Sequence, residues 1–175
     1  MTVHPMIQAQ ARLATPLGEM TAAATATGLA GLWFDGQSHH PGPLDVPVDA
    51  QQRWLQAAAR ALAAYFDGAD HPLQGLVLDL HGTPFQQAVW QALRALPRGA
   101  TRSYGEIAVA AGSPAAVRAA GAAIGRNPVS ILVPCHRVLG RDGSLTGYAG
   151  GLPRKQALLR LEGIAAAGSR ETLPT

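Results

Sequence analysis

The first part of the chain is a series of short, apolar-rich segments with turn residues between them. Residues 6–14, 19–25 and 29–34 have the length and composition of strands, and turn-forming sequences at 15–18 and 27–28 separate them. Connections this short join strands that run antiparallel. The pattern therefore predicts a small antiparallel sheet.

A helix is predicted after the sheet. Following a loop rich in Gly, Pro and His at residues 36–47, apolar side chains recur at helical spacing within residues 50–66, and Gly68 ends the helix. Residues 76–80 predict one further short strand. The helical stripe consists of Leu55, Ala58, Leu62 and Tyr65. The amino-terminal half therefore predicts α+β packing, and no motif in it points to a functional site.

Helical patterns dominate the second half. Thr83 and Pro84 are residue types favoured as an N-cap and as the first residue of a helix. The apolar stripe that follows them is most simply core, and it consists of Phe85, Val89, Trp90 and Leu93. Residues 153–162 predict the last helix, and Gly163 ends it.

Two short helices in this half are joined by a tight turn. Ser103 and Glu106 have the spacing of a capping box, so the first helix should begin at Tyr104, and it should stop at Gly112. The Ser-Pro pair that follows starts a second helix, over residues 113–124. This arrangement predicts a helix-turn-helix.

The second of these helices has a surface of small residues. Residues 115–124 include almost none of the side chains that read base edges in the major groove. A smooth helix with one long cation, Arg118, fits shape-based binding in the minor groove better. The alternative is that Arg118 is simply solvated, as most helix arginines are.

Charge is distributed unevenly along the 175 residues. Residues 1–81 carry three Arg and seven acidic residues, for a net charge of −4, whereas residues 82–175 carry ten Arg, one Lys and four acidic residues, for +7. Such a basic half points to a polyanionic partner, nucleic acid first, because Arg and Lys neutralise phosphates. A solvated basic face is the alternative.

Composition also limits the class of protein. With 47% hydrophobic residues the chain can bury a core, as one large domain or two small ones. A single cysteine excludes an internal disulfide and the usual multi-cysteine zinc sites. No export signal or membrane span is visible, so we expect a cytoplasmic protein. The histidines of the polar loops, which should face solvent rather than bind metal, are His39, His40 and His71.

The single cysteine, Cys135, stands in the sequence Val-Pro-Cys-His-Arg-Val, directly before His136. A thiol is a nucleophile as its thiolate, and a neighbouring base or cation lowers the thiol pKa into the working range. Free cysteine is also among the most buried residue types, so a small core residue is the alternative. The short motif alone does not decide between the two.

Several motifs in order resemble the O6-alkylguanine-DNA alkyltransferases. The resemblance is dense over residues 83–163 and weaker in the amino-terminal strands. The motifs that carry it are Gly121, Arg126-Asn127-Pro128-Val129-Ser130-Ile131-Leu132-Val133-Pro134-Cys135-His136-Arg137-Val138, Thr146-Gly147-Tyr148-Ala149-Gly150-Gly151-Leu152, Arg154-Lys155 and Leu158-Leu159-Arg160-Leu161-Glu162-Gly163. Membership would make Cys135 the nucleophile of a DNA repair protein.

The resemblance implies a mechanism on named residues. A methylated guanine is rotated out of the duplex, and Arg118 occupies the vacated space. Tyr104 donates a proton or hydrogen bond to the leaving purine. Cys135 takes the alkyl group once, with His136 as its base partner, through a water, and Glu162 orienting the imidazole. A carboxylate in the last turn opposes the helix dipole, a broken local rule of the kind that concentrates at functional sites.

Further residues are expected at the DNA and substrate surfaces. Asn127 precedes a proline, and the resemblance makes it a hinge between the helix-turn-helix and the cysteine turn. Two departures from relatives are Ala149 in place of a serine near O6 and Ser130 in place of a pocket proline. The expected DNA contacts are Ser113, Arg118, Ala119 and Gly121, and the expected pocket residues are Ile124, Asn127, Val138, Tyr148 and Ala149.

We therefore expect an α+β domain at residues 1–81, a mainly helical, winged-helix-like DNA-binding domain at 82–163 and a flexible tail at 164–175. The partner is duplex DNA containing alkylated guanine, with O4-methylthymine as a further candidate substrate. We expect no cofactor, no metal, no membrane contact and a monomer in solution, with assembly along DNA left open. Two alternatives are a non-catalytic lesion binder, which would lack the nucleophile, and a cysteine hydrolase, for which no oxyanion-hole motif is visible.

Overall fold

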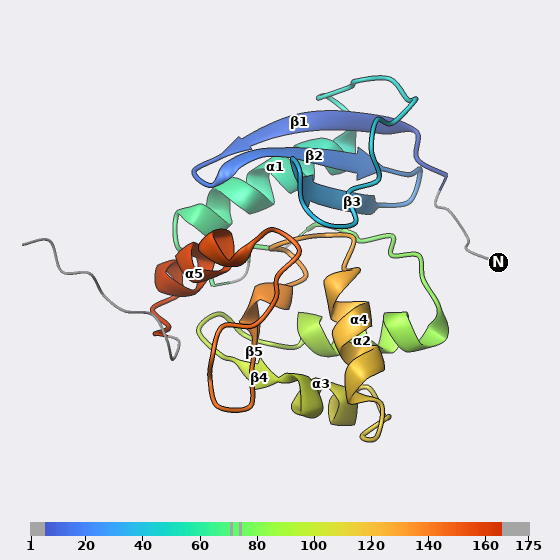
Figure 1. The fold of residues 1–175 in the computed structure, drawn as a ribbon. Coiled ribbons are helices and arrows are strands. Elements are labelled where there is room, and N and C mark those ends of the chain that lie inside the picture. Colours follow the sequence, from blue (N-terminus) through green and yellow to red (C-terminus); the bar gives the residue numbers. More distant parts are fainter. Residues whose placement is uncertain (1–5, 71, 74, 166–175) are drawn as a thin grey trace, which may run out of the picture.

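The computed structural model describes residues 6–70, 72–73 and 75–165 (Figure 1). A three-stranded sheet and one long helix form one half of the molecule, and short helices with a two-stranded parallel pair form the other. In chain order the elements are β1 (Ala9–Thr15), β2 (Gly18–Ala24), β3 (Leu29–Phe34), α1 (Arg53–Phe66), α2 (Pro84–Arg94), β4 (Arg102–Ser103), α3 (Tyr104–Ala110), α4 (Val117–Gly125), the 3-10 turn η1 (Cys135–Arg137), β5 (Val138–Leu139) and α5 (Leu152–Leu161). This architecture confirms the expected α+β class.

The sheet is antiparallel in the order β1-β2-β3, as predicted. The strand predicted over residues 76–80 is wrong, because only Leu78 forms a bridge, to Leu29. The backbone of Leu32 on the same edge of β3 is already bonded to another segment, since its N–H donates to Pro128 at 2.8 Å and its carbonyl accepts from Ser130 at 2.9 Å. The edge of the amino-terminal sheet therefore continues into the segment that leads to Cys135.

Helix α1 packs across the sheet through the predicted apolar stripe, all of which is buried. It begins at Arg53 rather than at residue 50, because the Gln52 side chain accepts hydrogen bonds from the N–H groups of Trp54 and Leu55 at 2.7 and 3.0 Å. It ends before Gly68, which has a φ of +94°. The last buried residue of the stripe, Tyr65, therefore lies at the carboxyl end of α1.

Helix α2 packs against α3 and α4 in the second half. Thr83 caps it as predicted, in a capping box with Gln86. Val89, Trp90 and Leu93 are buried, and Phe85 is half-buried. The Trp90 indole N–H donates to the carbonyl of Ala123 at 2.9 Å, which fixes α4 against α2.

The helix-turn-helix is present, and its first helix begins at Tyr104 with the predicted capping box of Ser103 and Glu106. The second helix begins at Val117, so the predicted start at residue 113 is wrong. The N–H of Ser113 still bonds to the carbonyl of Ala108 at 2.9 Å and completes the end of α3. A separate turn must follow before helical geometry can resume.

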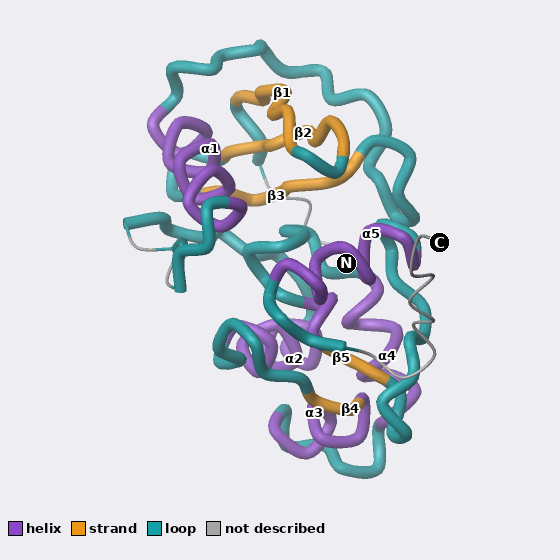
Figure 2. The backbone as a smooth tube through the Cα atoms, turned by 90° about the vertical axis from the view of Figure 1, so that its left-hand side faces the viewer, coloured by secondary structure: helices purple, strands orange, loops and turns teal. Residues whose placement is uncertain are grey.

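The two halves share one continuous apolar core, which runs from Ala9 to Leu158. Figure 2 shows β4 and β5 beside α2 and α3, below the sheet. Ile164, the first residue of the expected tail, packs against Leu139 and Leu159 and donates its N–H to the Leu159 carbonyl at 2.9 Å. Residues 166–175 lie outside the described part of the chain. No described helix has both the length and the apolar character that crossing a bilayer requires.

Candidate active site

Cys135 opens the turn η1 and borders a cavity. Its side chain is only 4% exposed, yet it faces a pocket of about 210 Å³. The pocket is lined by Tyr104, Gly121, Ile124, Gly125, Cys135, Gly147, Tyr148 and Ala149. The thiol is thus shielded by protein on most sides and reachable from one.

The turn that carries Cys135 is held by Asn127. The Asn127 amide nitrogen donates to the carbonyl of Val133 at 2.7 Å, and its amide oxygen accepts from the N–H of Val129 at 3.0 Å. Ile131, between these two partners, has a φ of +70°, which is a strained conformation for a β-branched residue. A buried amide that satisfies backbone groups on both sides of this residue fixes the path of the chain from α4 to Cys135.

Replacing Asn127 with alanine should therefore destabilise the protein. The buried N–H of Val129 would lose its partner, and the Val133 carbonyl, which also accepts from the N–H of Cys135 at 2.8 Å, would lose one of its two hydrogen bonds, at a cost of about 1 to 3 kcal/mol in the free energy of unfolding. Urea unfolding measures this loss. Gln91→Ala, which removes an exposed amide from α2, should change the same free energy by no more than about 0.5 kcal/mol. Equal stability of the two variants would contradict the assignment of Asn127.

His136 and Glu162 are in direct contact, 26 residues apart in sequence. The Nε2 atom of His136 lies 2.5 Å from Oε2 of Glu162, and both side chains are fully buried. Glu162 is the residue at which α5 ends. Its Oε1 atom accepts from Nε of Arg137 at 2.6 Å and from the backbone N–H of Gly99 at 3.1 Å. A third side chain, Tyr65, donates its hydroxyl to Oε2 at 2.7 Å.

Charge and burial set the protonation of this cluster. Burial acts to raise the pKa of Glu162, but hydrogen bonds from His136, Arg137 and Tyr65 outweigh it and hold that pKa well below its usual range. Burial lowers the pKa of His136 although Glu162 raises it. The Nδ1 atom of His136 is buried and has no hydrogen-bond partner among the described residues. The imidazole is therefore a neutral base at neutral pH, with Nδ1 free to accept a proton.

Burial opposes the lowering of the thiol pKa that a neighbouring base or cation would give. Burial raises the pKa of the Cys135 thiol above its ordinary value, although Asn127 and the charge of Lys155 act to lower it. With the pKa of His136 lowered as well, the resting state is a neutral thiol beside a neutral imidazole. The thiol must therefore give up its proton during the reaction.

Lys155 secures the wall of the cavity from inside the protein. Its ammonium group is fully buried and donates to the carbonyls of Val138 at 2.6 Å, Thr146 at 3.1 Å and Gly147 at 3.4 Å. Burial lowers the pKa of Lys155 to about 8, while the charge of Cys135 acts to raise it. No role was expected for Lys155 from the sequence. The one sequence feature that sets it apart is that it is the only lysine of the chain.

Two tyrosines border the cavity. The Tyr104 hydroxyl oxygen accepts from Oγ1 of Thr146 at 2.8 Å, and its proton is directed to the Gly147 carbonyl at 3.4 Å, which is a long hydrogen bond. That proton is therefore available for a stronger acceptor. The Tyr148 hydroxyl is buried without a partner in the described residues, and burial raises its pKa well above the usual value.

Only some of the other expected pocket residues line the cavity. Ile124 and Ala149 line it, whereas Asn127 and Val138 stand behind it. The Val138 carbonyl accepts from Lys155 at 2.6 Å, and a carbonyl oxygen has a second lone pair that can accept from another donor. Ser130 donates to the amide oxygen of Gln37 at 3.2 Å and so points to the amino-terminal half.

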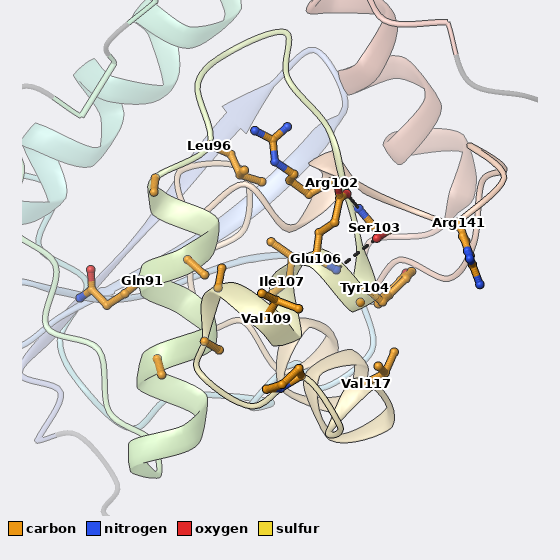
Figure 3. Close-up of a pocket in the computed structure, with 17 residues that line it drawn as sticks. Gln91, Leu96, Arg102, Ser103, Tyr104, Glu106, Ile107, Val109, Val117 and Arg141 are labelled. Carbon is orange, nitrogen blue, oxygen red and sulfur yellow. Dashed lines mark hydrogen bonds between the residues drawn. The ribbon is translucent and has the colours of Figure 1, made fainter.

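Of the expected DNA contacts, one lines the cavity and the others lie on α4 or in the turn before it. Arg118 and Ala119 are exposed on α4, Gly121 lines the cavity, and Ser113 is half-buried in the turn before α4. A wider groove of about 1330 Å³ lies beside them over α2 and α3 (Figure 3). Tyr104 borders both hollows. The exposed arginines that line the groove are Arg102 and Arg141.

Among the described residues, the histidines of the polar loops form no metal site. His39 is exposed, but His40 is half-buried beside Trp33, and its Nδ1 atom accepts from the N–H of Gly42 at 3.0 Å, so the expectation that His40 faces solvent is wrong. His71 lies outside the described residues. Within residues 6–70, 72–73 and 75–165 no group of three or more His, Cys, Asp or Glu side chains is placed to hold a metal.

Comparisons with known proteins agree with this geometry. Residues 84–164 match the family model described as 6-O-methylguanine DNA methyltransferase, DNA binding domain. A methylated-DNA--protein-cysteine methyltransferase of Mycobacterium tuberculosis is 47% identical over 148 residues, which cover 85% of this chain and 88% of that protein. One of Salmonella typhimurium is 58% identical over 102 residues, 58% of this chain and 60% of that protein.

Solved structures give the same result over nearly the whole chain. The crystal structure of Mycobacterium tuberculosis OGT in complex with DNA has a TM-score of 0.81 and 44% identity, and it covers 89% of this chain and 93% of that one. The O6-methylguanine-DNA methyltransferase of the archaeon Pyrococcus kodakaraensis shares the fold, with a TM-score of 0.63 at 24% identity. The chain described above therefore belongs to the methylated-DNA--protein-cysteine methyltransferase family.

Proposed function

We propose that this protein repairs O6-alkylguanine in duplex DNA by transferring the alkyl group to Cys135 in a single turnover. One observation carries the proposal. The only thiol of the chain lies on a cavity, and the next residue is a buried histidine whose Nε2 is held by a buried carboxylate and whose Nδ1 has no partner among the described residues. This arrangement can activate a nucleophile and leaves one face open for a single base.

The proposed step moves one proton and one alkyl group. The thiol proton passes to Nδ1 of His136, directly or through a water, and Glu162 stabilises the imidazolium that forms. The Cys135 sulfur then attacks the alkyl carbon, the bond from that carbon to O6 breaks, and its electron pair moves into the purine. Tyr104 donates its hydroxyl proton or hydrogen bond to the purine, and the proton that His136 took from the thiol returns through solvent to Tyr104 or to the guanine, so that the guanine gains the one proton that Cys135 lost. Guanine and an alkylated Cys135 are the products.

Access to the lesion requires base flipping, because the O6-alkyl carbon of a stacked base cannot reach a recessed sulfur. The exposed, small-residue surface of α4 lets the helix approach the minor groove closely, and Arg118 fills the space that the base leaves. The backbone N–H of Ala149 would replace the serine hydroxyl that some relatives place near O6.

Transfer to sulfur produces a thioether, which has no leaving group that water can displace under ordinary conditions. The protein is therefore consumed by its reaction, and the proposed step uses no metal or organic cofactor. Because the substrate is DNA and the acceptor is a free thiol, we propose that it works in the reducing cytoplasm. We also propose a division near residue 81 and a monomer in solution.

The stoichiometry of repair tests this function. Increasing amounts of protein are mixed with duplex DNA that contains one O6-methylguanine, and the restored guanine is counted. We expect a plateau at one guanine per active chain. Lesion binding without restored guanine would favour a non-catalytic binder, which the presence of Cys135 argues against. Restored guanine in excess of the protein would require turnover, as in a hydrolase.

Replacing Arg118 with alanine should slow repair of duplex DNA by about tenfold to hundredfold, because flipping costs a few kcal/mol that the inserted guanidinium offsets. Repair of a single-stranded oligonucleotide should change little, since no stacked duplex has to be opened. Single-turnover rates on the two substrates measure this difference. Arg160→Ala, which removes an exposed cation from α5, controls for charge alone. Equal loss on both substrates would contradict an intercalating role.

A further inference from the structure

Tyr65 connects the amino-terminal half of the molecule to the catalytic cluster. It is the penultimate residue of α1, the helix that packs against the three-stranded sheet in the amino-terminal half (Figure 1). Its hydroxyl nevertheless donates to Oε2 of Glu162 at 2.7 Å, the same oxygen that contacts Nε2 of His136. The side chain is 1% exposed. The proposed mechanism above assigns Tyr65 no role.

The Tyr65 ring is fixed in place on several sides. It packs edge-on against the His136 ring, with the ring centroids 6.2 Å apart and an interplanar angle of 72°. The Arg98 guanidinium lies 4.9 Å from the centre of the Tyr65 ring and donates to the Tyr65 carbonyl at 3.1 Å. A hydroxyl held this firmly can set the position of the atom to which it donates.

The carboxylate of Glu162 is fully engaged by four donors. Arg137 and the N–H of Gly99 occupy Oε1, while Tyr65 and His136 occupy Oε2. A carboxylate oxygen that already accepts one hydrogen bond is a weaker acceptor for the next. Tyr65 therefore restrains how strongly Glu162 draws the proton on Nε2 of His136, and it holds Oε2 where the imidazole needs it.

We propose that Tyr65 is a positioning residue for alkyl transfer, whose hydroxyl fixes Glu162 so that His136 keeps its Nε2 proton and offers Nδ1 to Cys135. The inference rests on the proposed function and adds to it a contribution from α1. The amino-terminal half then completes the catalytic cluster. This half therefore acts on the cluster directly, in addition to carrying the sheet edge that leads to Cys135.

The pH dependence of transfer should report this role. The charged and titratable groups around His136 and Glu162 are Cys135, Arg137, Tyr148, Lys155 and, behind the Tyr65 ring, Arg98. Arg137 and Lys155 lower the pKa of His136, and Glu162 raises it. Without the Tyr65 hydroxyl, Oε2 attracts the imidazole proton more strongly. The pKa of His136 should therefore rise. On acidification the imidazole should become protonated, and so cease to act as a base, at a higher pH than in the wild type.

The experiment compares Tyr65→Phe with the wild-type chain in single-turnover repair of methylated duplex DNA from acid to neutral pH. The amplitude counts active acceptors, and the rate constant reports the chemistry of those acceptors. We expect a rate constant about tenfold lower at neutral pH, on the scale of one hydrogen bond to a charged group. The acid limb should move to higher pH, with the affinity for lesion DNA unchanged.

A matched control removes a different buried hydroxyl of the amino-terminal half. Thr25→Val loses the hydrogen bond from Thr25 to Asp79, far from the cluster in the fold. It should lower thermal stability and leave the rate constant and the pH profile unchanged. Nitrogen-15 NMR of the His136 ring adds a readout without substrate, in which Tyr65→Phe should shift the imidazole titration upward and Thr25→Val should not.

Identical rate constants and pH profiles for Tyr65→Phe and the wild type would overturn the inference. An equal change in Thr25→Val would do the same, because it would indicate a general loss of packing. Absence of transfer in the wild type would instead refute the proposed function, while the NMR comparison would still test the contact. If some Tyr65→Phe chains are inactive, the amplitude of repair falls. The remaining active chains still give a rate constant, which tests the inference.

Discussion

Replacing Cys135 with alanine is expected to abolish alkyl transfer while the affinity for lesion-containing duplex DNA changes by no more than about twofold. The sulfur forms the new bond, and no other thiol exists in the chain to replace it. Binding depends on phosphate contacts and on base flipping, which the acceptor atom does not provide. A gel-shift titration and a single-turnover assay on the same duplex measure the two quantities separately.

Two further results would decide how Cys135 acts. Cys135→Ser keeps the size of the side chain but replaces the thiol with a hydroxyl, which is far harder to ionise, so its transfer rate should also be undetectable. Normal transfer in either variant would show that another atom accepts the alkyl group. Loss of DNA affinity together with transfer would mean that Cys135 is a packing residue, which its position on the cavity argues against.

Replacing Glu162 with glutamine should have the second largest effect, because it damages both the chemistry and the fold. The neutral amide cannot stabilise the imidazolium of His136, so the transfer rate should fall by about a hundredfold. The buried Arg137 guanidinium would lose its counter-charge, which should lower the free energy of unfolding by about 3 to 5 kcal/mol. Single-turnover kinetics and urea unfolding measure the two losses. Glu19→Gln, at an exposed carboxylate, should leave both measurements near their wild-type values.

The same carboxylate should make wild-type stability depend on pH in a defined direction. The pKa of Glu162 in the folded protein lies below its unfolded value of about 4.5. Its stabilising contribution is therefore complete above that unfolded value and is lost as the pH falls below it. Unfolding curves between neutral and acid pH should show this loss, and Glu162→Gln should show less of it. Matching pH profiles for the two proteins would contradict the assignment.

Local rules and the family resemblance predicted most of the site and much of the fold. The capping box of Ser103 and Glu106 placed the start of α3 at Tyr104, because both halves of that motif lie within four residues. Helical spacing identified the buried stripe of α1. The contact between His136 and Glu162 could not come from spacing, since 26 residues separate them, and it was expected from the resemblance alone.

The features that sequence reasoning missed depend on contacts between distant segments. From the sequence, Tyr65 was only one of the apolar residues of the helical stripe of α1. Its hydroxyl donates to Glu162, which lies 97 residues further along the chain. Lys155 gave no sign of burial beyond being the only lysine of the chain, because its three carbonyl partners come from loops and a short strand. The thiol pKa was expected to fall from neighbouring charge, whereas burial dominates. The late start of α4 follows from the turn between the helices, in which the N–H of Ser113 bonds to the Ala108 carbonyl of α3 and the Ser113 carbonyl accepts from the N–H of Ala116 at 2.9 Å.

Intact-protein mass spectrometry after incubation with O6-methylguanine duplex DNA should identify the acceptor atom. Each chain should gain one methyl group in place of a proton, peptide mapping should place that group on Cys135, and excess DNA should add no second group. An unmodified protein beside repaired DNA, or a methyl group on any other residue, would contradict transfer to Cys135.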